Sequence, residues 1–178
     1  MSGNIENLSP ENINAQVQGS NTGDKDRYLE FNLGEEKFAV PLLSVKEVIA
    51  VPETTKVPFT PEYFLGIMNL RGQVLSVIDL RNRMSITEKQ DDSETAVIII
   101  DLEYTQLGVV VDSINRVIAV GDNDMAPPPE IASSESTDFV TGCYKNDENL
   151  VLFLDVDKIL DHEDKELIKN SEKNKEAS

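Results

Sequence analysis

Two aspartates at equivalent positions are the first candidates for chemistry in this sequence. Asp79 and Asp155 each end an apolar stretch, and both the aspartates and the stretches are offset by 76 residues. Paired carboxylates from duplicated halves can share a proton and activate water, which is the chemistry of an aspartic hydrolase. Neither aspartate, however, precedes the small Ser/Thr-Gly turn that would expose it to a substrate. We therefore favour a capping or turn role for both carboxylates over catalysis.

The other reactive residue types predict no catalytic centre. His162 is the only histidine and lies among acidic residues, as expected of a solvated surface residue. Cys143 is the only cysteine, so an intramolecular disulfide is excluded, and its apolar setting favours a small core thiol. The sequence has no Gly-rich phosphate loop and no Cys/His cluster suited to zinc. We therefore expect no enzymatic activity, no cofactor and no metal.

Arg71 breaks the symmetry between the two halves of the chain. Its counterpart at the offset of 76 residues is Asp147, which would be surprising if Arg71 only supported a shared fold. A guanidinium on a turn, followed by Gly72 that permits close backbone approach, is suited to hold a partner's carboxylate or amide. An ion pair with a neighbouring acid on this acidic chain is the alternative, and the sequence leaves the two readings open.

An internal repeat organises the elements that position these residues. Residues 29–51 align without gaps with residues 98–120, and residues 74–80 align with residues 150–156. Short strands at regular intervals in two units of roughly 60 residues are typical of two small antiparallel barrels. We therefore expect a mainly β fold that arose by internal duplication.

The apolar patterns predict the same order of elements in each unit. Helical spacing of apolar residues predicts short helical turns at residues 42–49 and 112–117. Alternating or continuous apolar runs predict the strands. The expected strands are residues 28–33, 37–41, 74–80, 96–102, 107–111, 118–120 and 150–156.

The composition also predicts domain boundaries. Residues 1–27 are rich in Ser, Asn, Gln, Gly and acids, so we expect a disordered arm. Two intertwined barrel subdomains are expected at roughly residues 28–90 and 91–156, followed by a helix at residues 157–170. Residues 172–178 are expected to form a frayed tail.

Charge limits the class of partner. The formal net charge is −17, so nucleic acid and anionic membranes would both be repelled. The sequence contains neither a signal peptide pattern nor an apolar run long enough to span a bilayer. We therefore expect a soluble, cytoplasmic protein.

The segment 69–81, Asn-Leu-Arg-Gly-Gln-Val-Leu-Ser-Val-Ile-Asp-Leu-Arg, resembles the signature of the CheW family of bacterial chemotaxis coupling proteins. Segments 38–48, 108–112 and 139–142 support the resemblance, which runs from about residue 28 to residue 167. It implies two SH3-like, five-stranded antiparallel barrels with a shared core. The module also occurs in the kinase CheA and in CheV, but the sequence shows neither kinase domains nor a receiver domain.

The resemblance also implies a function and its partners. A protein of this family is a non-enzymatic scaffold that couples the cytoplasmic tips of methyl-accepting chemoreceptors to the regulatory domain of the histidine kinase CheA. It would be a monomer when isolated and would be recruited to membrane-associated receptor arrays. An adaptor of a paralogous array that controls pili or gliding is the alternative within the family.

Two contact surfaces follow from the resemblance. A receptor helical hairpin would lie in a groove between the barrels, at Val45, Glu47, Arg71, Ala96, Gly108 and Ile114, although spacing alone favours core packing for Val45. The kinase would contact an exposed edge of the first barrel and a proline-rich loop of the second. The matching positions are Val51, Thr55, Val57, Pro58, Ala126 and Ile131. Because a basic residue is frequent in the family at the position of Ala126, a weaker or differently built contact is expected there.

Overall fold

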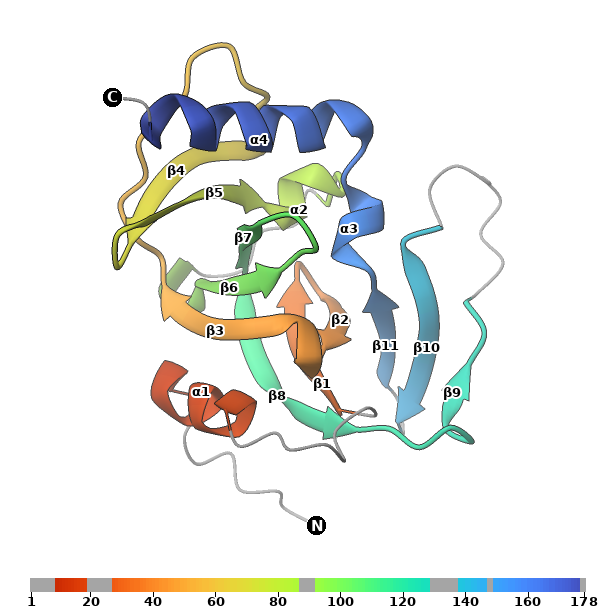
Figure 1. Cartoon of the computed structure of the whole chain (residues 1–178). Helices are drawn as coiled ribbons and strands as arrows, with labels where there is room; N and C mark the ends of the chain where they lie inside the picture. The colour runs from red at the N-terminus through yellow and green to blue at the C-terminus, as the bar shows by residue number, and fades with distance from the viewer. Residues whose placement is uncertain (1–8, 19–26, 87–91, 129–137, 147–148, 177–178) are drawn as a thin grey trace.

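The computed structural model describes residues 9–18, 27–86, 92–128, 138–146 and 149–176 (Figure 1). It shows two β-sheets in the middle of the molecule, with one helix below them and a longer helix above them in this view. Among the described residues, no helix is both long and apolar enough to cross a bilayer.

The first sheet has the strand order β8-β1-β2-β11-β10-β9. All its neighbouring strands are antiparallel except β11 and β2. Its strands are β1 (Arg27–Leu33), β2 (Glu36–Pro41), β8 (Ser113–Ala119), β9 (Met125–Ala126), β10 (Val140–Asn146) and β11 (Asn149–Leu154).

The second sheet has the order β3-β6-β7-β5-β4, with β5 and β7 as its parallel pair. Its strands are β3 (Val45–Ala50), β4 (Phe64–Leu70), β5 (Gln73–Asp79), β6 (Ala96–Asp101) and β7 (Gln106–Val111). The strand orders of the two sheets match through the repeat, because β8, β1, β2, β11 and β10 are the counterparts of β3, β6, β7, β5 and β4.

The two repeats exchange hairpins, so neither sheet is built from one continuous segment on either side of residue 90. The β1–β2 hairpin of the first repeat joins strands β8 to β11 of the second, while the β6–β7 hairpin joins β3 to β5. Each sheet contains the hairpin of the other repeat in place of its own equivalent hairpin. Because the two hairpins are similar in sequence, the repeat alone does not reveal this exchange. The mainly β fold with two sheets is confirmed, and the two-residue β9 adds a sixth strand to the first sheet.

A large apolar core contains residues of both sheets, and we call it the shared core. Each sheet also has a smaller apolar cluster of its own. The shared core includes Phe31, Leu80, Ile98 and Leu154, all less than 2% exposed. Burial of this apolar surface from both repeats is the main stabilising contribution to the fold.

Both predicted helical turns are wrong over most of their length. Only η1 (Leu42–Ser44) is helical in the first, and the residues that follow form β3, which pairs with β6. Residues 113–119 form β8, which pairs with β1. In both segments, pairing with a distant strand overrides the local helical spacing.

The C-terminal helix is divided in two and longer than expected. Asp155 caps α3 (Val156–Ile159), and two residues separate the end of α3 from the start of α4 (His162–Glu176). Asp161 and Asp164 make reciprocal side-chain bonds to each other's backbone N–H, at 2.8 and 3.0 Å, which is the geometry of a capping box. Helix α4 continues to Glu176, beyond the expected end at residue 170, and residues 177–178 lie outside the described residues.

The N-terminal arm contains a docked helix, so the prediction of disorder is wrong for residues 10–18. Helix α1 (Pro10–Gln18) packs against β3 and β8, with Ile13 only 1% and Val17 only 7% exposed. These two apolar residues are four positions apart and lie on one face of the helix. Residues 1–8 and 19–26 of the predicted arm lie outside the described residues.

Candidate docking surfaces

The equivalent aspartates are helix caps. The Asp79 carboxylate accepts a hydrogen bond from Asn82 N–H at 3.2 Å, at the start of α2 (Leu80–Arg83). The Asp155 carboxylate accepts from the N–H groups of Asp157 and Lys158 at the start of α3. The capping role is confirmed, and it accounts for both residues because each ends a strand that turns directly into a helix.

The other reactive residues also lie where the sequence predicts. His162 is exposed at the start of α4. Cys143 is a free cysteine in β10, 9% exposed, with its Sγ 3.4 Å from the carbonyl oxygen of Pro127. The prediction of a core thiol is confirmed.

Arg71 forms an ion pair with Glu47, another residue of the predicted receptor-binding surface. Its Nη1 and Nη2 donate to Oε1 and Oε2 of Glu47 at 2.6 and 3.0 Å, a two-point ion pair. The hydrogen bond from Arg71 lowers the pKa of Glu47, while burial opposes that shift. The Arg71 side chain is 71% exposed, against 12% for Glu47. The ion-pair reading of Arg71 is confirmed, and the guanidinium remains open to a partner.

The backbone presents Arg71 in an unusual way. Arg71 has a φ of 52°, a left-handed conformation that is rare outside glycine. The side chain of Asn69 accepts a hydrogen bond from Gly72 N–H at 2.8 Å and shapes the turn between β4 and β5. Because β3 and β4 are the two edges of their sheet, the pair between this turn and Glu47 helps to close the sheet into a barrel.

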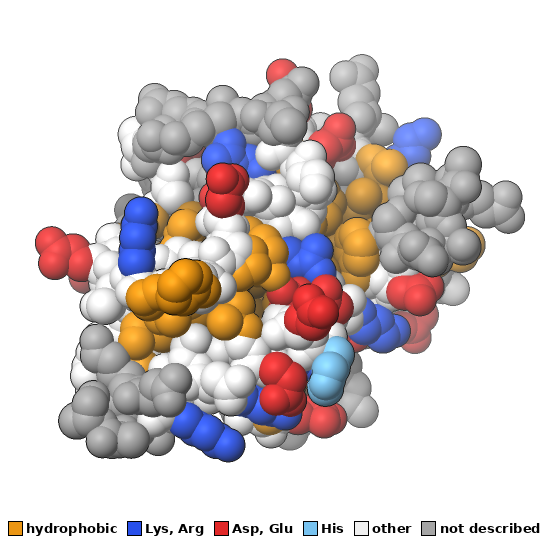
Figure 2. Space-filling view, turned by 90° about the horizontal axis from the view of Figure 1, so that it is seen from above, with side chains coloured by type: hydrophobic (Ala, Val, Ile, Leu, Met, Phe, Trp, Pro, Cys, Tyr) orange, Lys and Arg blue, Asp and Glu red, His pale blue; other side chains and the backbone are white. Residues whose placement is uncertain are grey.

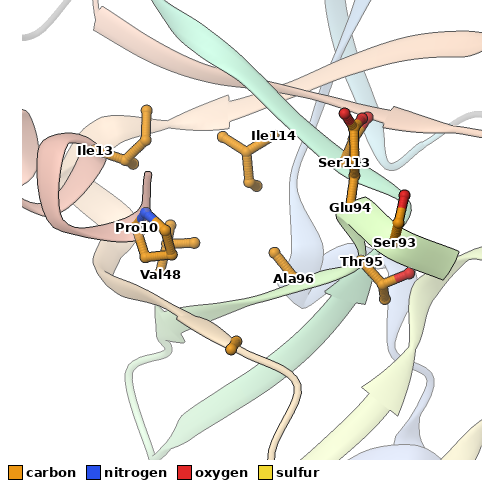
Figure 3. Close-up of a pocket in the computed structure, with 10 residues that line it drawn as sticks. Pro10, Ile13, Val48, Ser93, Glu94, Thr95, Ala96, Ser113 and Ile114 are labelled. Carbon is orange, nitrogen blue, oxygen red and sulfur yellow. The ribbon is translucent and has the colours of Figure 1, made fainter. Parts of the chain in front are cut away.

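An apolar groove lies where the edge strands β3 and β8 approach each other. Figure 3 shows Ile13, Val48, Ala96 and Ile114 around a cavity of about 300 Å³. Of the predicted receptor positions, Ala96 and Ile114 line this groove. Sequence reasoning missed Val48 and Ile13, although the spacing of Ile13 and Val17 was a signal of an amphipathic helix.

Ala96 and Ile114 are each only 8% exposed, and two further predicted receptor positions are packed inside the protein. Val45 is 5% exposed and belongs to the shared core, which confirms its core-packing reading. It lies in strand β3 rather than on a helix. Gly108 in β7 is buried, and an added Cβ would lie 3.2 Å from Val97 and 3.3 Å from Val77. We infer that Gly108 allows close packing of neighbouring strands rather than direct contact.

The predicted kinase edge is a loop between β3 and β4. Val51 is 46% exposed, Pro58 is exposed, and Val57 packs partly against the shared core. Phe59, which the sequence reasoning missed, is fully exposed and has a φ of 63°. Apolar side chains gather on this end of the molecule (Figure 2). Such a projecting aromatic ring is typical of an interface anchor.

Thr55 and Ala126 occupy corresponding places in the two barrels. Thr55 forms a β-bridge to Ile67 of β4, and Ala126 of β9 pairs with Cys143 of β10. Both bridges pass close to a glycine of the repeat. A Cβ at Gly66 would lie 2.2 Å from the Thr55 carbonyl oxygen, and at Gly142 it would lie 3.1 Å from that of Ala126. Ile131 lies outside the described residues.

The fold and these surfaces define a β-sheet binding module, with an apolar groove, a charge-paired turn and an exposed aromatic loop. A family model described as the CheW-like domain matches residues 27–164. The chain belongs to the CheW-like family. The expected resemblance is thereby confirmed.

Relatives and a solved structure agree with this assignment. The chemotaxis protein CheW of Klebsiella aerogenes is 29% identical over 156 residues, which cover 88% of this chain and 93% of that protein. CheW of Bacillus subtilis is 31% identical over 142 residues, covering 80% and 90%. The crystal structure of the scaffolding protein TtCheW from Thermoanaerobacter tengcongensis matches with a TM-score of 0.67 and 32% identity, covering 74% of this chain and 89% of that one.

Proposed function

We propose that this chain is a chemotaxis scaffold that couples chemoreceptors to the histidine kinase CheA. It does so by contact alone, without making or breaking a covalent bond. It works in the cytoplasm and is recruited to receptor arrays at the membrane. The proposal rests on family membership together with the groove between β3 and β8.

The groove is suited to a helix of a receptor. Ala96 and Ile114 supply apolar area from two different sheets, and an amphipathic helix docks by laying its apolar face into such a groove. Strand β3 connects the groove to the charged turn, since Val48 lines the groove and Glu47 binds Arg71. The exposed guanidinium then provides orientation, because charged rims set register more than affinity.

The loop between β3 and β4 is suited to the regulatory domain of the kinase. Phe59, Val51 and Pro58 present apolar surface beside the Thr55 bridge, which supports this edge as the kinase contact. The groove and this loop are separate features of the molecule, so one chain can hold both partners at once.

Reconstitution tests the proposal. Purified protein, CheA and a receptor cytoplasmic fragment should form a ternary complex in which the methylation state of the fragment controls CheA autophosphorylation. Each binary affinity can be measured separately by titration calorimetry. Autophosphorylation that is indifferent to the added protein, with no binding to either partner, would refute the function.

A further inference from the structure

Helix α1 is an addition to the family module. The family model begins at residue 27, whereas α1 ends at Gln18. Figure 1 shows α1 lying against β3 and beside β8, the edge strands of the two sheets. The helix therefore covers the same groove that Ala96 and Ile114 line.

The side chain of Asn14 in α1 makes two hydrogen bonds to the backbone of β3. The amide of Asn14 donates to the Val48 carbonyl oxygen at 2.9 Å, and its oxygen accepts from the Val48 N–H at 2.6 Å. Val48 is in an edge strand, whose outward N–H and C=O groups would otherwise be available to another chain. Asn14 thus satisfies both groups as a partner's polar side chain would.

Apolar contacts accompany this polar clamp. Ile13 and Val17 are buried, and both belong to the shared core of the protein. An isolated helix of nine residues is marginal in water, so α1 depends on docking for its structure. Its release would therefore be coupled to its unfolding.

The seat of α1 is only partly filled. The cavity of about 300 Å³ remains between the helix, the edge strands and the segment at Ser93–Thr95. This pocket is open to solvent on one side, so α1 leaves part of its apolar lining uncovered. A longer amphipathic helix would fill more of this groove than α1 does.

We propose that α1 is an internal occupant of the helix-docking groove, and that an amphipathic helix of the partner displaces it. This inference rests on the proposed function, and the partner helix is that of the receptor tip. The protein then exists in a closed state, with Asn14 on Val48, and an open state that binds. The apparent dissociation constant exceeds the intrinsic one by the inverse of the open fraction.

Variants of the full chain test this competition. Asn14→Ala removes two hydrogen bonds, which should raise the open fraction and tighten binding of the receptor fragment about tenfold. Ile13→Asp should tighten it at least as much, since a carboxylate cannot stay in the apolar seat. Gln16→Ala, on the exposed side of α1, is the matched control and should leave the affinity unchanged.

Hydrogen exchange gives a second, receptor-independent measurement. The Val48 amide should exchange about tenfold faster in Asn14→Ala than in wild type or Gln16→Ala, because its acceptor is lost. A merely structural role for α1 predicts the opposite sign in the binding assay, since destabilised variants would bind receptor more weakly. Equal affinity of wild type and both α1 variants would overturn the inference and leave the proposed function intact. Absence of receptor binding by every variant would instead refute the proposed function.

Discussion

Arg71 and Glu47 bind each other across the two edges of one barrel. The guanidinium reaches from the turn between β4 and β5 to a carboxylate in β3, 24 residues earlier, and makes a contact at each oxygen. One end of this ion pair is mostly buried and the other is exposed. The pair therefore links the closure of the barrel to the surface proposed for the receptor.

Reversing the charge at this position should weaken receptor binding. Arg71→Glu places two carboxylates together and removes the exposed donor, so we expect the affinity for the receptor fragment to fall about tenfold or more. The double variant Arg71→Glu/Glu47→Arg restores the internal pair but moves the guanidinium to β3. If the partner reads the guanidinium at residue 71, the double variant stays weak; recovery of full affinity would show that only the internal pair matters. Calorimetry and thermal melts measure the two effects separately.

The ion pair predicts the titration of Glu47. Because Arg71 lowers its pKa below the ordinary value of 4.5, the pair contributes stability above that pH and loses it as the pH falls through the lowered value. The Arg71→Gln variant should move the Glu47 pKa upward and flatten the acid limb of the stability profile. Carboxyl NMR of wild type and variant checks this prediction, and an unchanged Glu47 titration would contradict it.

A charge at Val45 should damage the fold rather than one binding surface. Val45 is 5% exposed within the shared core, so Val45→Asp buries an unpaired carboxylate and should cost about 3–5 kcal/mol of unfolding free energy. Lys46→Asp, at the exposed neighbour, should cost less than about 1 kcal/mol. Urea denaturation compares them, and equal small losses would show that the core accommodates the charge.

Phe59 should be an anchor for the kinase. Replacing this fully exposed ring by serine should reduce the affinity for the CheA regulatory domain by about 2 kcal/mol or more, with no loss of receptor binding. Leu43→Ser is the matched control, because Leu43 is 66% exposed but lies on η1, outside the predicted kinase edge. Similar losses of affinity from both substitutions would indicate non-specific hydrophobic binding instead of a defined interface.

Glycine is required at Gly66 and Gly72 for different reasons, namely close backbone contact at Gly66 and backbone conformation at Gly72. Both have positive φ, but a Cβ would meet the Thr55 carbonyl oxygen at 2.2 Å at Gly66 and nothing within 4 Å at Gly72. Gly72→Ala should therefore cost about 1 kcal/mol from backbone strain alone, and Gly66→Ala should cost about 2–4 kcal/mol because it also breaks the Thr55 bridge. Equal losses in chemical denaturation would show that the bridge gives way at little cost.

The sequence correctly predicted features that depend on neighbouring residues, such as the helix caps and the burial of Cys143. Asp79 and Asp155 act as caps because each precedes its own helix, and Cys143 is buried because its neighbours form a buried strand. The spacing of Leu42, Val45 and Val48 fits a helix, yet the backbone of β3 pairs with β6, about 50 residues away along the chain. The residues near β3 in the sequence do not identify this distant pairing partner.

The candidate site shows the same division. The repeat identified Arg71 as asymmetric, but its partner Glu47 became known only when the fold brought β3 near the β4–β5 turn. Helix α1 was missed because two apolar residues in a polar segment do not outweigh its composition, whereas docking against β3 and β8 does. Phe59 was missed because exposure of a single aromatic residue depends on the loop that carries it.

The exchanged hairpins have a consequence for how the protein is made. A ribosome that has released only the first repeat has supplied β3, β4 and β5 without the β6–β7 hairpin that completes their sheet. Neither barrel can close until synthesis has passed Val111, the end of β7. Until then both sheets of the nascent chain are incomplete. Two polypeptides cut between the repeats would each lack a hairpin, and each would recover it only from the other.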